Sequence, residues 1–148
     1  MEDFVSDGVR MIYAGGDESQ RGVAVLLDGT AAKCVTSVER HSDRLLVVNL
    51  HASRRDFVLI QVYMPTTAHT DEEVDVLYEQ MEAILQEMKG DVMVLGDWNA
   101  VVGESPEDDC VGKFGLGSRN DRGQKLVEHV VQTRKTAKVY MEEPWRLC

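Results

Sequence analysis

Residues 44–65 read RLLVVNLHASRRDFVLIQVYMP, two apolar runs separated by a polar stretch. The runs cover 45–50 and 57–62, and the polar HASRRD between them is typical of a β-hairpin turn. Neither run alternates cleanly between apolar and polar residues, which predicts strands covered on both faces. Pro65 cannot donate a hydrogen bond to a β-ladder, so it should end the second strand. The segment therefore predicts a buried β-hairpin.

The segment after the hairpin predicts an amphipathic helix that ends at Gly90. Thr70 and Glu73 have the spacing of a capping box, and the acidic residues 71–73 suit a helix N-terminus. Apolar residues recur at three- and four-residue spacing and form one stripe. The stripe consists of Val74, Leu77, Met81, Ile84, Leu85 and Met88.

Further elements are expected on both sides of this hairpin and helix. They are a strand at 21–27 entered through Gly22, a strand at 91–95, a glycine-rich loop at 102–120, a helix at about 121–133 and a short strand at 137–141. The second helix has Asn120 as a candidate N-cap. Its apolar side consists of Leu126, Val127, Val130 and Val131. This order predicts a mixed α/β (α+β) arrangement with helices covering sheet faces.

Composition and length indicate an ordinary globular protein. At 148 residues, with 43% apolar and 28% charged residues, the chain suits a single domain spanning 1–148. No run approaches the roughly 20 apolar residues of a membrane span, and residues 1–13 lack the apolar core of a secretory signal. Cys34, Cys110 and Cys148 are far apart and lack metal-ligand spacing. We therefore expect a reduced intracellular protein in the nucleus or cytoplasm, neither secreted nor in a membrane.

The net charge of −10 bears on the kind of partner that the chain can bind. Proteins held on nucleic acid by general electrostatics are basic, so tight non-specific binding to DNA is disfavoured. A metal site remains compatible with an acidic chain, because there the cation meets the phosphate. Solubility alone is the alternative explanation of the charge.

Polar residues stand directly after the apolar strand at 91–95. If the extended geometry persists, Asp97 and Asn99 share one face and Trp98 points the opposite way, into packing. A carboxylate can orient and deprotonate water or hold Mg²⁺, and an amide can donate to a phosphoryl oxygen or complete a metal shell. The alternative is an Asx turn or N-cap that closes the strand.

Two further places carry candidate site residues. Tyr63 ends the second hairpin strand, where a tyrosine is usually a core or rim residue. In GLGSRNDRG (115–123), backbone donors, Arg119 and Asn120 precede a helix N-terminus, a natural anion site. The alternative for this stretch is a loop followed by an N-cap.

The four histidines lack metal-ligand spacing such as i, i+4. His129 is expected on the surface of the second helix, and His51 beside the hairpin turn.

Three motifs, taken together and in this order, resemble the endonuclease/exonuclease/phosphatase family. They are QVYMPTT (61–67), DVMVLGDWNAVVG (91–103) and GKFGLGSRNDRGQKLVEHV (112–130). In particular, the chain resembles the apurinic-type endonuclease domains of non-LTR retrotransposons and their craniofacial development protein 2-like relatives. The resemblance runs from about Gly22 to Val131, and residues 71–85 look like the family's helix.

The resemblance implies two packed β-sheets flanked by helices and a Mg²⁺-dependent cleavage of phosphodiester bonds in DNA. In that scheme Asp97 orients or activates the attacking water, Asn99 binds the scissile phosphate or the metal, and Tyr63 contacts the phosphate. Asp97 and Asn99 are thus the expected metal ligands, and Arg119 and Asn120 are expected at the substrate. Metal and fixed donors would stabilise the charge of the transition state.

The chain also departs from the family pattern. Members carry a metal-binding glutamate on an early strand, and Glu2 and Glu18 are in the wrong setting for it. Members also close with an Asp and a Ser-Asp-His segment, which is not found before Cys148. The resemblance therefore predicts a domain truncated at both ends, with little or no activity of its own. We also expect marginal stability and self-association through exposed strand edges.

Two other functions are compatible with the sequence. One is a non-catalytic interaction module that keeps the fold and binds protein through its acidic surface. The other is a metallophosphoesterase of another type, but that class requires an upstream Asp-x-His and a downstream Gly-Asn-His, and the chain has neither.

Overall fold

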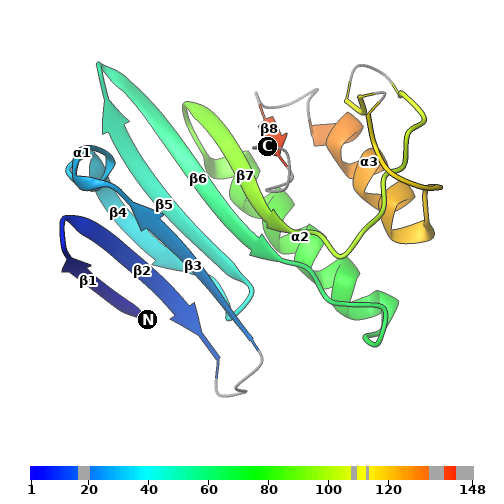
Figure 1. Ribbon diagram of the computed structural model, residues 1–148, viewed down its shortest axis with the longest axis horizontal. Helices are drawn as coiled ribbons and strands as arrows, with labels where there is room; N and C mark the ends of the chain where they lie inside the picture. Colours follow the sequence, from blue (N-terminus) through cyan, green and yellow to red (C-terminus); the bar gives the residue numbers. More distant parts are fainter. Residues whose placement is uncertain (17–20, 108–109, 113, 134–138, 143–148) are drawn as a thin grey trace. The chain divides into compact units, whose positions relative to one another are not determined.

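The computed structural model describes residues 1–16, 21–107, 110–112, 114–133 and 139–142. Over these ranges the fold is α+β, with a three-stranded sheet, a five-stranded sheet and three helices (Figure 1). The expected two-sheet α/β class is therefore confirmed. The chain divides into two compact units. The first contains the described residues within Met1–Tyr63, Met88–Asp97 and Tyr140–Cys148, and the second those within Met64–Glu87 and Trp98–Val139.

The three-stranded sheet belongs to the first unit and is an antiparallel meander (Figure 1). Its strands are β1 (Glu2–Ser6), β2 (Val9–Gly15) and β3 (Gly22–Leu27). The prediction of a strand entered through Gly22 is confirmed, whereas β1 and β2 were not anticipated. Asp7 and Gly8 join them with φ of 52° and 80°, the left-handed conformation that a two-residue hairpin turn requires.

The five-stranded sheet has the order β4-β5-β6-β7-β8. Its strands are β4 (Val35–Arg40), β5 (Leu45–Ala52), β6 (Arg55–Tyr63), β7 (Asp91–Asp97) and β8 (Val139–Glu142). β4, β5 and β6 are antiparallel, whereas β6 and β7 are parallel and are linked through a helix. The short helix α1 (Gly29–Ala32) precedes β4, and neither α1 nor β4 was predicted.

The predicted hairpin is β5 and β6, and β6 ends before Pro65 as expected. Its turn contains only Ser53 and Arg54, both with positive φ. The first four residues of β5 are buried, as predicted for a strand covered on both faces. In β6, burial alternates instead, with Val58, Ile60 and Val62 buried and their neighbours partly exposed, so that prediction was wrong for β6. On the second face of β6, Leu59 and Tyr63 are only partly buried, and they pack against the core cluster formed by β2, β3 and β5.

Within the first unit, the two sheets share one hydrophobic core. It contains residues of β2, β3 and β5 that alternate along each strand, because side chains in a strand point to opposite faces in turn. They are Ile12, Ala14, Val23, Val25, Leu46 and Val48.

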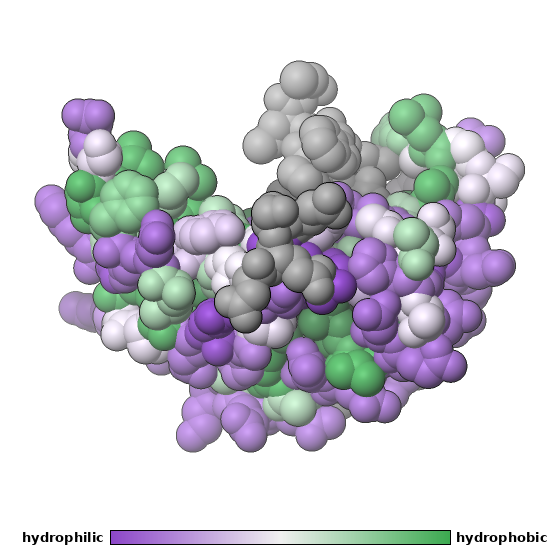
Figure 2. All heavy atoms as spheres, turned by 90° about the horizontal axis from the view of Figure 1, so that it is seen from below, coloured by the Kyte–Doolittle hydropathy of each residue, from purple (hydrophilic) through white to green (hydrophobic). Residues whose placement is uncertain are grey.

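The outer face of the three-stranded sheet is also apolar. Phe4, Met11 and Leu26 are opposite one another across β1, β2 and β3 and form one row. Phe4 is 48% exposed and Leu26 is 62% exposed. Figure 2 shows hydrophobic side chains on the surface at the left, the side on which β1 and β2 lie in Figure 1.

The second unit contains α2 (Asp71–Glu87) and α3 (Asp121–Thr133). The capping box is confirmed, because Thr70 N donates to Glu73 Oε2 and Glu73 N donates to Thr70 Oγ1, each at 3.3 Å. α2 ends at Glu87, earlier than the predicted end at Gly90. Its buried stripe contains the predicted residues within the helix and adds Tyr78.

The predicted second helix is confirmed as α3, but the prediction for His129 was wrong. His129 is only 6% exposed, because it packs against α2 and not on the surface. His51 does lie beside the hairpin turn, with Nδ1 2.7 Å from Asp56 Oδ1. The predicted strand at 137–141 corresponds to β8, whereas residues 137–138 lie outside the described part of the chain, as do Glu18 and Cys148. Within the described ranges, the helices are too short or too polar to cross a membrane.

Candidate functional site

Tyr63 and Asp97 occupy the ends of two neighbouring parallel strands. They are register partners at the C-terminal ends of β6 and β7. Because β6 and β7 run in the same direction, their carboxyl ends lie at the same edge of the sheet, and the chain returns between them through a crossover that includes α2. Asp97 is exposed and Tyr63 is half-buried. The fold thus places two of the predicted site residues next to each other in the first unit.

Gly96 allows β7 to lie this close to β6. A Cβ atom at this position would be 1.9 Å from the carbonyl oxygen of Val62. Any side chain here would push the two strand ends apart. Glycine is therefore required before Asp97 because the strand that carries Tyr63 lies too close to allow a side chain.

The chain changes direction directly after Asp97. Trp98 is 5% exposed, so its predicted burial is confirmed. Asn99 has φ of 46°, so the extended geometry assumed for a shared face of Asp97 and Asn99 ends before Asn99, and that premise was wrong. In the second unit, Asn99 Nδ2 donates to the carbonyl oxygen of Met64 at 2.8 Å. This backbone-bonded asparagine in the left-handed region agrees with the turn alternative.

Asn120 is the N-cap of α3. Its Oδ1 accepts hydrogen bonds from Gly123 N at 2.7 Å and from Val101 N at 3.1 Å. The first bond satisfies a free N–H group of the first helical turn, and the second fastens the loop after β7 to the helix. The carboxamide oxygen is therefore used within the protein.

Arg119 fixes the conformation of the loop that precedes it in the sequence. Nε donates to Val102 O at 2.9 Å and Nη2 to Ser105 O at 3.0 Å. Nη1 donates to Gln124 Oε1 at 3.1 Å and pairs with Glu107. These contacts give Arg119 a structural role, while substrate binding by Arg119 and Asn120 stays a prediction.

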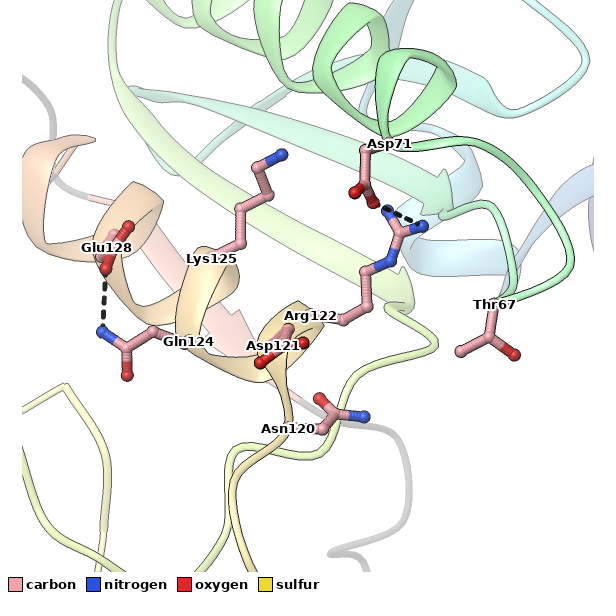
Figure 3. A pocket seen from close by; sticks show the side chains of 8 residues that line it. All are labelled: Thr67, Asp71, Asn120, Asp121, Arg122, Gln124, Lys125 and Glu128. Atoms are coloured by element: carbon pink, nitrogen blue, oxygen red, sulfur yellow. Dashed lines mark hydrogen bonds and ion pairs between the residues drawn. The ribbon is translucent and has the colours of Figure 1, made fainter.

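A hollow of about 490 Å³ lies at the N-terminal end of α3 (Figure 3). It is lined by Thr67, Asp71, Asn120, Asp121, Arg122, Gln124, Lys125 and Glu128. Arg122 reaches from α3 to α2, where Nη2 is 3.1 Å from Asp71 Oδ1 (Figure 3). Its Nη1 is buried without a hydrogen-bond partner among the described residues. Both carboxylates and basic side chains line this hollow. Its charge alone therefore does not indicate that it binds an anion.

Three contacts between α2 and α3 form what we call the α2–α3 ion-pair row. The row consists of Arg122 with Asp71, Lys125 with Asp75, and His129 with Glu82. Each basic side chain is on α3 and each carboxylate is on α2, and His129 is a cation only when it is protonated. The row connects the two helices of the second unit.

His129 is the buried member of this row. Nδ1 is 3.3 Å from Glu82 Oε1, and the ring centroid is 4.6 Å from that of Tyr78. Nε2 is buried and has no partner within the described part of the chain. Burial lowers the pKa of His129 below its ordinary value, and Glu82 opposes this effect. Burial also raises the pKa of Tyr78.

Arg44 contacts Tyr63 and was not identified from the sequence. It directly precedes β5, is 8% exposed, and its guanidinium carbon is 5.0 Å from the centre of the Tyr63 ring. The available signal was an arginine immediately before the four apolar residues 45–48. That signal does not reveal a partner 19 residues further along the chain.

The side chains at the strand ends can be compared with the needs of Mg²⁺. Within the described ranges, no group of three or more His, Cys, Asp or Glu side chains lies close enough to hold a metal. Mg²⁺ is commonly bound through one or two carboxylates, with water and substrate phosphates completing its shell. The exposed carboxylate of Asp97 fits that mode of binding.

Comparison with known proteins identifies relatives over most of the chain. The chain is 32% identical over 131 residues to craniofacial development protein 2 of Bos taurus, covering 86% of this chain and 22% of that protein. It is 29% identical over 150 residues to craniofacial development protein 2 of Tragulus javanicus, covering 99% of this chain and 26% of that protein. No protein-family model matches the chain. The chain is thus homologous to craniofacial development protein 2, although it spans only about a quarter of the length of these curated relatives.

Proposed function

We propose that this chain is a phosphodiester-cleaving domain of the endonuclease/exonuclease/phosphatase type, of retrotransposon origin, that acts on DNA with Mg²⁺. The observation that carries the proposal is the register pair of Tyr63 and Asp97 at the ends of parallel β6 and β7. The three sequence motifs and the similarity to craniofacial development protein 2 support the choice of family.

Each candidate residue has a role that suits its chemistry. The Asp97 carboxylate would orient and deprotonate the attacking water and would hold Mg²⁺. The Tyr63 hydroxyl would donate a hydrogen bond to a phosphate oxygen of the DNA. Asn120 could contribute only its Nδ2 group to the substrate, because Oδ1 accepts two backbone hydrogen bonds. Bound Mg²⁺ would stabilise the negative charge that develops on the phosphoryl group.

Plasmid nicking in the presence of Mg²⁺ tests this proposal. We expect weak nicking by the wild-type chain, because the family's metal glutamate and Asp-His pair have no matched counterpart in its sequence. Asp97→Asn should lower the rate by about 10²- to 10⁴-fold, the usual contribution of a general base. Asp91→Asn is the matched control, because Asp91 begins the same strand at its opposite end. Absence of nicking by the wild type, or equal rates for wild type and Asp97→Asn, would overturn the proposal.

A non-catalytic protein-interaction module is the second candidate. It is favoured by the exposed row of Phe4, Met11 and Leu26 on the three-stranded sheet, since exposed apolar patches mark interaction surfaces. This function predicts that the chain does not cleave plasmid DNA and that Asp97→Asn leaves binding to a protein partner unchanged.

A further inference from the structure

We propose that Arg44 is the residue that positions Tyr63 for phosphate binding. The inference rests on the proposed function, because it concerns the tyrosine at the proposed site. It adds a residue that no sequence motif indicated.

Arg44 binds both polar groups of the Tyr63 main chain. Tyr63 N donates to the carbonyl oxygen of Arg44 at 2.9 Å, which extends the β5–β6 ladder beyond the pair of Leu45 and Val62. In return, Arg44 Nη1 donates to the carbonyl oxygen of Tyr63 at 3.2 Å. The first bond uses the main chain of residue 44 and does not require an arginine, whereas the second depends on the guanidinium, which therefore fixes the Tyr63 carbonyl at the point where β6 ends.

The same guanidinium also lies against the aromatic ring of Tyr63. Its carbon is 5.0 Å from the ring centre, within the range of a cation–π contact. A planar guanidinium can stack on a ring and donate to a carbonyl oxygen together, whereas a lysine ammonium lacks this flat fork. The contact restricts the ring orientation and therefore the position of the hydroxyl.

The burial of Arg44 argues that this arrangement does more than fill space. A charged side chain that is 8% exposed is costly to bury, and an apolar residue would pack the strand end at lower cost. In a chain of net charge −10, Arg44 adds positive charge beside the tyrosine that would meet a phosphate. Asp97 is the register partner of Tyr63 on its other side, so Tyr63 lies between the arginine-bearing strand end and the carboxylate.

The kinetic test compares Arg44→Met, Arg44→Lys, Tyr63→Phe and the double variant Arg44→Met/Tyr63→Phe in the nicking assay. Arg44→Met should lower kcat by about 10- to 100-fold, the cost of a misplaced group, and change KM by less than about twofold. Arg44→Lys should recover only a small part of the loss. The double variant should be no slower than Tyr63→Phe, because Arg44 acts through Tyr63. Multiplied losses in the double variant would overturn the inference.

A second readout does not depend on cleavage. In protein labelled with 3-fluorotyrosine, the ¹⁹F signal of Tyr63 is assigned by its absence in Tyr63→Phe. This signal should move in Arg44→Met and Arg44→Lys, and it should stay in place in Arg40→Met, which changes an exposed arginine of β4. An unmoved signal in both Arg44 variants would overturn the inference, and Arg44→Lys alone decides if Arg44→Met does not fold. If the wild type fails to nick DNA while the signal moves, the proposed function fails and the positioning contact stands.

Discussion

Replacing Asn120 with alanine separates a capping role from a substrate role. Asn120 Oδ1 accepts hydrogen bonds from Gly123 N and Val101 N, so alanine removes both acceptors at once. Asn120→Asp keeps an acceptor oxygen in the same place and adds negative charge at the helix N-terminus, where it is tolerated or favourable.

The expected loss of stability follows from these two hydrogen bonds. Loss of an N-cap costs about 1 kcal/mol, and loss of a further hydrogen bond about another 1 kcal/mol. Asn120→Ala should therefore lower the free energy of unfolding by about 2 kcal/mol, or roughly 30-fold in the unfolding equilibrium constant. Asn120→Asp should stay within about 0.5 kcal/mol of the wild type.

Urea unfolding followed by circular dichroism at the helix band measures these differences. A loss smaller than about 0.3 kcal/mol in Asn120→Ala would refute the capping argument. The nicking assay then isolates the substrate role, because Asn120→Asp retains the cap but loses the Nδ2 donor. A folded Asn120→Asp protein that nicks DNA at the wild-type rate would exclude DNA binding by that amide.

Two further predictions concern the cores of the two units. Burial holds the pKa of His129 below its ordinary 6.5, so the folded state binds fewer protons than the unfolded state between these two pKa values. Stability should therefore fall as the pH is lowered from about 6.5 towards the lower pKa of the folded state, and His129→Gln should lose less over that interval; equal losses in urea unfolding would contradict this. Gly96→Ala should lower the free energy of unfolding by more than about 2 kcal/mol, because its Cβ would meet Val62 O at 1.9 Å. Gly117→Ala is the control, because a Cβ at Gly117 meets no atom within 4 Å. This substitution should cost only about 1 kcal/mol, which comes from the positive φ of Gly117. Similar losses of stability in the two variants would argue against the contact between the Gly96 position and Val62.

The sequence predicted best what depends on residues close together in the chain. Thr70 and Glu73 specify the start of α2 through contacts across three residues, and Asn120 caps α3 in the same way. The hairpin of β5 and β6 is likewise a local structure. The Asp7-Gly8 turn belongs to the same class, because Asp-Gly is a strong hairpin signal that would have indicated β1 and β2.

Long-range contacts set the limit of prediction for the candidate site. Asp97, the last residue of β7, could be recognised because polar residues at strand ends often carry function, but its pairing with Tyr63 depends on the parallel register of two strands. Arg44 and His129 each depend on a partner in another element, which a single sequence does not reveal. Asn99 leaves the extended conformation because its amide binds the chain after β6, a contact 35 residues away in sequence.

The α2–α3 ion-pair row has a consequence for the choice of helix register. Ion pairs that water still reaches contribute at most about 1 kcal/mol each, so the pairs of Arg122 with Asp71 and of Lys125 with Asp75 add little to stability. However, Asp121 and Glu128 directly precede Arg122 and His129, two of the three basic α3 residues of the row. Rotating α3 by one residue would bring these carboxylates towards the carboxylates of α2 and turn attraction into repulsion. The row therefore selects one alignment of the helices by penalising its neighbours, a form of specificity that does not require much binding energy.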